Sequence, residues 1–419
     1  MKSYFYIEGK KYKKDDFPKK FVEESYFVKN FEDTYTLKFC GIVNYKKKFY
    51  IFFPKGYRIE QYSEKENIEN AKLLFKSILQ YRDSVTLDEY EYNWLGNKNS
   101  NIEHINIITW IIQDYFTHGI YIDSKKKYEI NGKGSIDWNN TINKTTPILK
   151  NNKTRYMNFI TKKSTYNTDN QISQIHESII LECLHDFGWL FNFHPIKKRG
   201  SINTNTNQQI IILKKKLRDT FSTREIKLLQ YLITYLQKNK SNGKNYVIIT
   251  PYFNNIWEKM LQQLISPNTD LLSTTPKPYW KLPRIKQKQY TRQIPDILIQ
   301  YNNDLIIIDA KYYSIESNKT SKFPGWESIV KQLYYSLSLK NENYNEIKNI
   351  FLFPQTLQDK TYHYIGFTAV EGKENELGHI KSFSIDIRTV LKGYLQIKQR
   401  TFLDTLVNQY DEISKKIDA

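Results

Sequence analysis

Two apolar runs in the last third of the chain, Gln293-Ile-Pro-Asp-Ile-Leu-Ile-Gln300 and Asp304-Leu-Ile-Ile-Ile-Asp-Ala-Lys311, are separated by the short polar segment Tyr301-Asn-Asn303. Ile- and Leu-rich runs on either side of a polar turn predict neighbouring strands of a buried hairpin. At one end of this hairpin stand Asp296, which begins the first strand, and Asp309 and Lys311, which end the second. Residues two apart on a strand point to the same face, so we expect Asp309 and Lys311 to project together while Ala310 faces the core.

Two carboxylates and one ammonium group are therefore expected at one end of a sheet. Carboxylate oxygens at such a point suit Mg²⁺, which keeps several waters and takes only one or two protein carboxylates. A neighbouring lysine can orient or activate one of those waters for attack on a phosphodiester. The alternative interpretation is a solvated strand end, because acidic and basic residues are frequent throughout the chain.

Two helices are predicted in the sequence around this hairpin. The segment 252–265 has apolar residues at helical spacing and carries Glu258, and the segment 326–339 contains Gln332-Leu-Tyr-Tyr335. A further apolar strand, Asn349-Ile-Phe-Leu-Phe353, follows the second helix. The alternatives are an exposed helix carboxylate for Glu258 and a core position for Tyr335.

Pro295-Asp296 and Asp309-Ala-Lys311 resemble the motif of the PD-(D/E)XK nuclease superfamily, and the predicted order of helix, hairpin, helix and strand is similar to its core. The resemblance implies an α/β fold with a restriction-endonuclease-like core, in which helices flank a mixed central sheet. It also implies that Asp296 and Asp309 bind one or two Mg²⁺ ions, with the Ala310 carbonyl as a further ligand. Lys311 would position the attacking water and stabilise charge on the phosphate. Hydrolysis in related enzymes leaves a 5′-phosphate and a 3′-hydroxyl.

The same resemblance assigns roles to the two predicted helices. Many members have an acidic residue on the helix before the sheet, so Glu258 is expected to assist the metal. Gln332-Leu-Tyr-Tyr335 is similar to the Q-x-x-Y element of RecB-type nucleases, whose Gln and Tyr support the site or contact the nucleic acid. Gln332 is thus a candidate catalytic residue, and Tyr335 a candidate DNA contact.

A narrower resemblance, to the LlaJI-type restriction endonuclease family, covers about residues 38 to 395. The segments that carry it are Cys40-Gly-Ile-Val43, Phe53-Pro-Lys-Gly56, Asn131-Gly-Lys-Gly-Ser-Ile-Asp-Trp-Asn-Asn-Thr-Ile142, Ile175-His-Glu-Ser-Ile-Ile180, Phe253 to Glu258, Asp309-Ala-Lys-Tyr-Tyr313 and Lys331-Gln332. It implies a site-specific endonuclease that cuts double-stranded DNA in a bacterial restriction-modification system directed against phage. Partners implied by the resemblance are a McrB-like AAA+ GTPase subunit and a cognate DNA methyltransferase. A RecB-type repair or recombination nuclease, and a catalytically silent DNA-binding or assembly subunit, are the alternative functions.

The charge of the chain suits a polyanionic partner. It has 63 basic and 44 acidic residues, a formal net charge of +19. Basic residues crowd the connection that leads into Asp296: Lys277, Lys281, Arg284, Lys286, Lys288 and Arg292. Cations there could follow DNA phosphates without reading sequence, and a solvated basic loop is the alternative. The sequence has no G-x-x-x-x-G-K-[ST] motif, so we expect no nucleotide site in this chain.

A chain of 419 residues exceeds what one small core supports, so several subdomains are expected. We predict an N-terminal α+β region at 1–165 for DNA recognition or partner contact, a helical connecting segment at 166–245, and the nuclease domain at 246–419. Within the first two regions we expect helices at 70–81 and 105–116, strands at Tyr121-Ile122 and Ile136-Asp-Trp138, and a polar loop at 201–209. Only two cysteines, Cys40 and Cys183, and no long apolar run occur, which predicts a cytoplasmic protein without membrane insertion.

Overall fold

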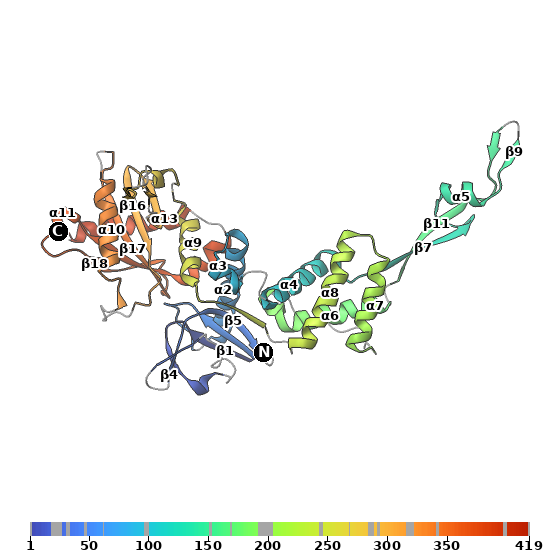
Figure 1. The fold of residues 1–419 in the computed structure, drawn as a ribbon, viewed down its shortest axis with the longest axis horizontal. Helices are drawn as coiled ribbons and strands as arrows, with labels where there is room; N and C mark the ends of the chain where they lie inside the picture. The colour runs from blue at the N-terminus through green and yellow to red at the C-terminus, as the bar shows by residue number, and fades with distance from the viewer. Residues whose placement is uncertain are drawn as a thin grey trace. The chain divides into compact units, whose positions relative to one another are not determined.

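The computed structural model describes residues 2–17, 27–30, 34–45, 48–61, 63–95, 100–150, 153–167, 170–191, 204–242, 246–267, 269–283, 289–290, 294–315, 322–340, 343–396 and 400–417. The chain forms two compact units (Figure 1). The first combines residues 1–102 with residues 245–419, and the second comprises residues 103–244. Within the described part of the chain, no helix is both long and apolar enough to cross a membrane.

The N-terminal part of the first unit is built on a four-stranded sheet. Its strand order is β1 (Lys2–Ile7), β6 (Lys48–Phe53), β5 (Cys40–Tyr45) and β12 (Tyr246–Thr250), with β1 parallel to β6 and the other pairs antiparallel. A smaller antiparallel sheet of β2 (Lys11–Lys13), β4 (Thr34–Leu37) and β3 (Phe27–Lys29), the short helix η1 (Lys14–Asp16), and helices α2 (Glu64–Ser84) and α3 (Glu89–Leu95) complete this part. Aromatic side chains dominate its core, where Phe52 lies within 5.4 Å of the rings of both Tyr6 and Phe39.

The C-terminal part of the first unit contains a mixed five-stranded sheet. Its order is β15 (Ile297–Tyr301), β16 (Asp304–Ala310), β17 (Ile347–Gln355), β19 (Ile380–Asp386) and β18 (Tyr362–Thr368). Strands β16, β17 and β19 are parallel, while β15 and β18 are antiparallel edge strands. The predicted hairpin is confirmed, and so is a mixed α/β fold with a central sheet between helices.

Helices cover both faces of this sheet (Figure 1). On one face lies α10 (Trp326–Leu339), where Tyr335 packs against Leu298 and Ile307. The other face holds α9 (Phe253–Ile265), α12 (Ile387–Gln396) and α13 (Arg400–Ile417). These three pack tightly, since a Cβ on Gly393 of α12 would come within 3.0 Å of side chains of α9 and α13. Four short elements complete this part: η3 (Thr269–Ser273), α11 (Glu374–Leu377), and the strands β13 (Tyr279–Trp280) and β14 (Gln289–Tyr290), which pair with each other in an antiparallel hairpin.

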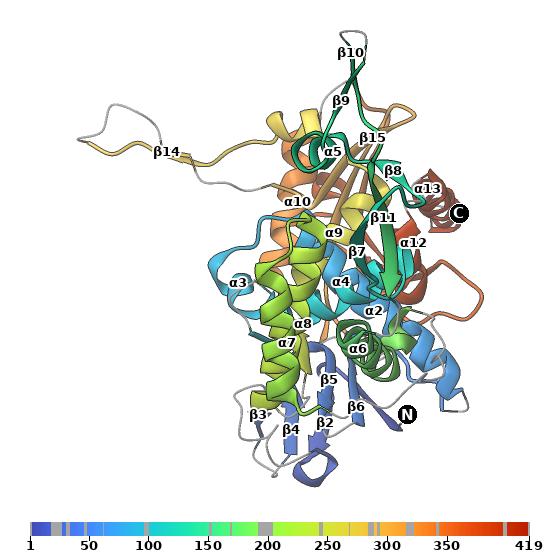
Figure 2. The same ribbon diagram turned by 90° about the vertical axis from the view of Figure 1, so that its right-hand side faces the viewer.

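The second unit is a helical group with a small sheet. Its helices are α4 (Ser100–His118), α6 (Gln171–Phe187), η2 (Gly188–Phe191), α7 (Thr206–Arg218) and α8 (Thr223–Asn242), of which α7 and α8 run side by side (Figure 2). Strands β7 (Asp123–Ile130), β11 (Ile160–Asn167) and β8 (Ser135–Ile136) form the sheet, beside which lie α5 (Trp138–Lys144) and the hairpin of β9 (Ile148–Lys150) and β10 (Lys153–Arg155).

The units divide the chain differently from the predicted regions. Residues 1–165 fall into both units, and residues 246–419 share their unit with residues 1–102. Strand β12, at the start of the predicted nuclease domain, pairs with β5 of the N-terminal sheet. The predicted boundaries were based on local composition. Local composition does not indicate pairing between strands that are about two hundred residues apart in sequence.

Three local predictions were wrong. Tyr121 and Ile122 precede β7, which begins at Asp123. Trp138 begins helix α5, because the Asp137 side chain accepts a hydrogen bond from Asn140 N and caps the helix. Residues 206–209 of the predicted loop start α7, where Asn205 and Gln208 form a capping box.

Candidate active site

The hairpin of β15 and β16 brings the predicted acidic and basic residues together. Ile297 pairs with Ile308, so Asp296 and Asp309 are neighbours across the two strands. The backbone N–H of Ala310 donates a hydrogen bond of 2.8 Å to Asp296 Oδ2. Lys311 Nζ lies 2.8 Å from Asp309 Oδ2 and 3.1 Å from Ser328 Oγ on α10. Lysine and carboxylates thus meet at one end of the hairpin.

These residues face a pocket of about 640 Å³ in the first unit. Residues from the C-terminal part line most of it: Pro251, Asn254, Glu258, Asp296, residues 309–314, Lys322 and Lys331. Glu8, Gly9 and Lys55 of the N-terminal part complete the wall. The pocket therefore combines several carboxylates with several ammonium groups.

The carboxylates repel one another electrostatically. Burial, together with the charges of Asp309 and Glu258, raises the pKa of Asp296 to about 8. Burial and the charge of Asp309 also raise the pKa of Glu258, while Lys311 and Lys331 act in the opposite direction. A cation between Asp296 and Asp309 would relieve this repulsion and favour the ionised form of Asp296.

The donor set fits a hard divalent cation. Asp296 and Asp309 offer carboxylate oxygens beside the backbone of Ala310, and the buried Asp309 Oδ2 lies 2.8 Å from the Lys311 ammonium group. Mg²⁺ needs only one or two carboxylates because waters complete its shell. Across the residues that the structure describes, no three His, Cys, Asp or Glu side chains are grouped closely enough to hold a metal. Glu258 shares the pocket without forming such a group.

Gln332 and Tyr335 lie beneath the sheet and not in the pocket wall. Gln332 is fully buried, and its Nε2 donates a hydrogen bond of 3.3 Å to the carbonyl of Ile307, two residues before Asp309. Tyr335 is 1% exposed, and burial followed by the charges of Asp296 and Asp309 raises its pKa to about 12. The structure therefore places Tyr335 in the core. Gln332 is positioned to support β16.

The basic connection before β15 is described only in part. Lys277 and Lys281 are exposed on either side of β13. The other predicted DNA contacts, Arg284, Lys286, Lys288 and Arg292, lie outside the described residues.

Sequence reasoning missed the N-terminal wall of the pocket. Tyr312, next to Lys311, donates a hydrogen bond of 2.5 Å to Glu8 Oε2 and accepts one of 3.0 Å from the backbone N–H of Lys55. Cys40 Sγ also donates to Glu8 Oε2, at 2.8 Å. Lys55 lies in the Phe53-Pro-Lys-Gly56 segment, which the sequence flags as a turn after an apolar strand. No local signal connects that turn with Tyr312, because 257 residues separate Lys55 from it.

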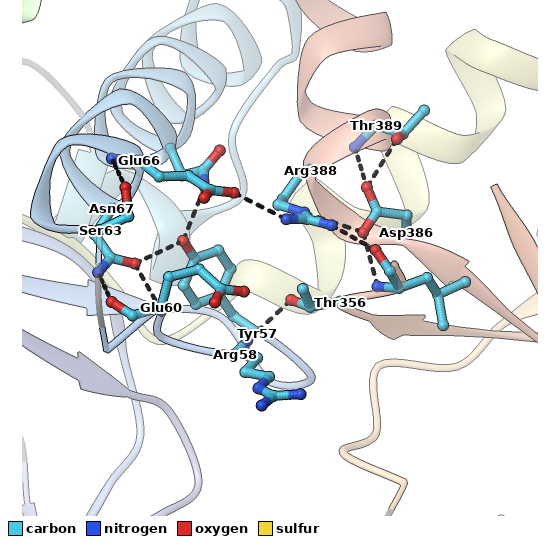
Figure 3. Close-up of polar contacts among 12 residues, drawn as sticks. Tyr57, Arg58, Glu60, Ser63, Glu66, Asn67, Thr356, Asp386, Arg388 and Thr389 are labelled. Carbon is cyan, nitrogen blue, oxygen red and sulfur yellow. Dashed lines mark hydrogen bonds and ion pairs between the residues drawn. The ribbon is translucent and has the colours of Figure 1, made fainter. Parts of the chain in front are cut away.

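A second cavity, of about 840 Å³, lies between α2, α12 and the segment after β17. Arg388 forms ion pairs there with Glu66 at 3.0 Å and with Asp386 at 3.2 Å, and donates to the Leu357 carbonyl (Figure 3). Asp386 also accepts hydrogen bonds from the backbone and hydroxyl of Thr389. These contacts tie helix α2 of the N-terminal part to the C-terminal sheet. The Glu66 and Asp386 carboxylates of this cavity are therefore both engaged by Arg388.

Comparisons with known proteins find a related protein, a solved structure of limited similarity and a matching family. The chain is 24% identical, over 99% of its length and 93% of the relative, to the "Type II restriction enzyme BsuMI component YdjA" of Bacillus subtilis (strain 168). A solved structure, the refined half-complex of Thermococcus gammatolerans McrB AAA+ hexamers with bound McrC, is similar with a TM-score of 0.37 and 13% identity, over 94% of this chain and 99% of that chain. The LlaJI restriction endonuclease family matches residues 39–388. Since this match covers most of the sequence, the chain belongs to the LlaJI restriction endonuclease family.

Proposed function

We propose that this chain is the nuclease component of a restriction system and hydrolyses phosphodiester bonds of double-stranded DNA with the help of Mg²⁺. The observation that carries the proposal is the convergence of Asp296, Asp309 and Lys311 on one pocket, in a member of a restriction endonuclease family. The arrangement supports a PD-(D/E)XK-type core, because the acidic pair and the lysine stand at the end of a hairpin within a mixed sheet between helices.

In the proposed mechanism, Asp296, Asp309 and the Ala310 carbonyl would hold the cation. When bound, Mg²⁺ would supply Lewis-acid stabilisation of charge on the phosphate. Lys311 is held by Asp309 and Ser328, so its ammonium group can orient the attacking water and donate to a phosphate oxygen. Glu258 adds negative charge at the pocket and can accept a proton there, since its pKa is raised by burial. Gln332 keeps β16 in place through the Ile307 carbonyl.

The proposal includes partners. The relative from Bacillus subtilis is described as a component of its restriction enzyme, which favours an enzyme assembled from more than one chain. A McrB-like AAA+ GTPase and a cognate methyltransferase would supply DNA translocation and protection of host DNA. Site-specific cleavage would distinguish this function from that of a structure-selective repair nuclease.

The test is cleavage of plasmid DNA by the full chain, with the other components of its system, in the presence of Mg²⁺. We expect Asp309→Ala and Asp296→Ala to abolish cleavage while DNA binding stays within about threefold of wild type, because phosphate contacts elsewhere supply most of the affinity. Glu327→Ala is the matched control: this exposed carboxylate on α10 lies outside the pocket, and its loss should leave cleavage unchanged.

Each outcome decides a different point. Discrete fragments from the wild type indicate site specificity, while degradation from ends favours the RecB-type alternative. An Asp309→Ala protein that cuts at the wild-type rate would remove this pocket from the mechanism. A wild type that binds DNA but never cuts would favour a silent assembly subunit.

A further inference from the structure

The N-terminal sheet contributes a wall to the candidate active site. Strands β1 and β6 are parallel, so their C-terminal ends meet at one edge, where Glu8 and Gly9 follow β1 and Lys55 follows β6. All three residues line the pocket that contains Asp296 and Asp309. This wall is therefore a second source of charged groups for the pocket, contributed by residues far from the hairpin in sequence.

The backbone around Lys55 is fixed against the C-terminal sheet. Its own N–H donates to Tyr312 Oη at 3.0 Å, and the next carbonyl, that of Gly56, accepts from the N–H of Thr356 at 2.9 Å. The N–H of Arg58 donates to Thr356 Oγ1 at 2.9 Å (Figure 3). Gly56 has φ +80°, and a Cβ there would meet the Pro354 carbonyl oxygen at 2.0 Å. These contacts hold Lys55 at a defined place in the pocket wall.

The side chain of Lys55 is anchored but retains hydrogen-bonding capacity. Its ammonium group lies 4.9 Å from the centre of the Tyr312 ring and 3.6 Å from Glu8 Oε1, which is longer than a normal hydrogen bond. Glu8 Oε2 is already engaged by Tyr312 and Cys40. The Lys55 side chain is 33% exposed, compared with 14% for Lys311, which is bound to Asp309 and Ser328.

We propose that Lys55 binds a backbone phosphate of the DNA strand that enters the pocket. The proposal rests on the proposed nuclease function, because it takes DNA as the ligand. An ammonium group with three donors acts as a point charge toward phosphate and carries no base specificity. Glu8 and Tyr312 are positioning residues, since they hold Lys55 at the wall and tie it to the residue that follows Lys311. The N-terminal sheet then takes part in aligning the strand that is cut.

The test compares three substitutions in the full chain: Lys55→Ala, Lys55→Arg and Lys48→Ala. Lys48 is the matched control because it is an exposed lysine at the opposite end of the same strand, β6, and outside the pocket. Binding to a linear duplex is measured in EDTA at several salt concentrations. Neutralising one phosphate contributes about 0.9 to the slope of log K against log salt, so Lys55→Ala should reduce this slope by about 0.9 and weaken binding about fivefold. Lys55→Arg should retain both values, and Lys48→Ala should retain the slope.

Equal slopes for Lys55→Ala and Lys48→Ala would overturn the proposal. Urea unfolding of each variant separates loss of a phosphate contact from loss of structure. If Lys55→Ala is destabilised and Lys55→Arg is not, the Lys55→Arg variant decides the outcome, and it must keep the wild-type slope. The binding slope does not depend on catalysis. Failure of the wild type to cut DNA with Mg²⁺ and its partners would instead count against the proposed function.

Discussion

The Asp296 and Asp309 carboxylates are close together in a buried site, and this proximity shapes the chemistry of the pocket. In the absence of a cation, burial and the neighbouring charge favour the protonated form of Asp296, whose pKa rises from 3.8 to about 8. The same crowding favours a divalent cation, which would favour the ionised form of Asp296. Lys311 offsets only part of the charge because it is a single ammonium group and lies beside Asp309.

This raised pKa predicts how stability depends on pH. A carboxyl group whose pKa is higher in the folded than in the unfolded state makes its full contribution to stability below the unfolded-state pKa of 3.8. This contribution is lost as the pH rises through the folded-state pKa of about 8. In EDTA, we therefore expect the free energy of unfolding of wild type to fall relative to Asp296→Asn by roughly 5 kcal/mol between pH 4 and pH 9, about 1.4 kcal/mol for each of about four pKa units. Urea denaturation of both proteins at these two pH values measures the difference. A difference that does not change with pH would contradict the assigned environment of Asp296.

At the scale of single elements, the sequence predicts best what depends on local periodicity. The helix at 326–339 and the hairpin strands were predicted with nearly their observed bounds, because apolar spacing and the turn at Asn302 and Asn303 act over a few residues. Both asparagines have positive φ, as a tight turn between strands requires. The convergence of Asp296 with Asp309 was also expected, since it follows from the hairpin itself.

Long-range contacts explain what could not be predicted. The pairing of β12 with β5 joins residues that an entire helical unit separates in sequence, and Gly41 permits it because a Cβ there would meet the Ile248 carbonyl at 2.0 Å. The pocket wall of Glu8 and Lys55 also results from long-range contacts, because both residues form hydrogen bonds with Tyr312. Tyr335 was assigned to DNA by its motif, whereas helical spacing alone favoured the core position in which it lies.

The turn after β6 gives a prediction for this element. Gly56 and Gly372 both have positive φ, at +80° and +74°, but an added Cβ would collide with the Pro354 carbonyl only at Gly56, while Gly372 faces open space. We expect Gly372→Ala to lower the free energy of unfolding by about 1 kcal/mol through backbone strain alone. Gly56→Ala should lower it by about 3 kcal/mol, because the turn must also move away from β17. Urea unfolding of the two variants checks this, and equal losses would mean that the turn is not held against β17.

On the scale of the whole chain, the unit that contains the candidate active site is assembled from two separate segments, and residues 103–244 are inserted between them. The N-terminal segment supplies Glu8 and Lys55 to the pocket, so it is more than a recognition module attached to an independent nuclease domain. Truncation of the chain before residue 246 would remove part of the pocket wall as well as three strands of the sheet that contains β12.

The final prediction concerns dependence on a partner. The sequence contains no P-loop motif, so the purified chain should hydrolyse neither GTP nor ATP. If an AAA+ GTPase partner regulates cutting, GTP should stimulate Mg²⁺-dependent cleavage only when that partner is added, and the response should be measured on plasmids with and without target sites. Asp309→Ala is the control: mixed with the partner it should leave GTP hydrolysis intact and abolish cleavage, because the substitution affects only the nuclease pocket. Efficient cutting of specific sites by the isolated chain with Mg²⁺ alone would contradict this arrangement and describe a self-sufficient type II enzyme.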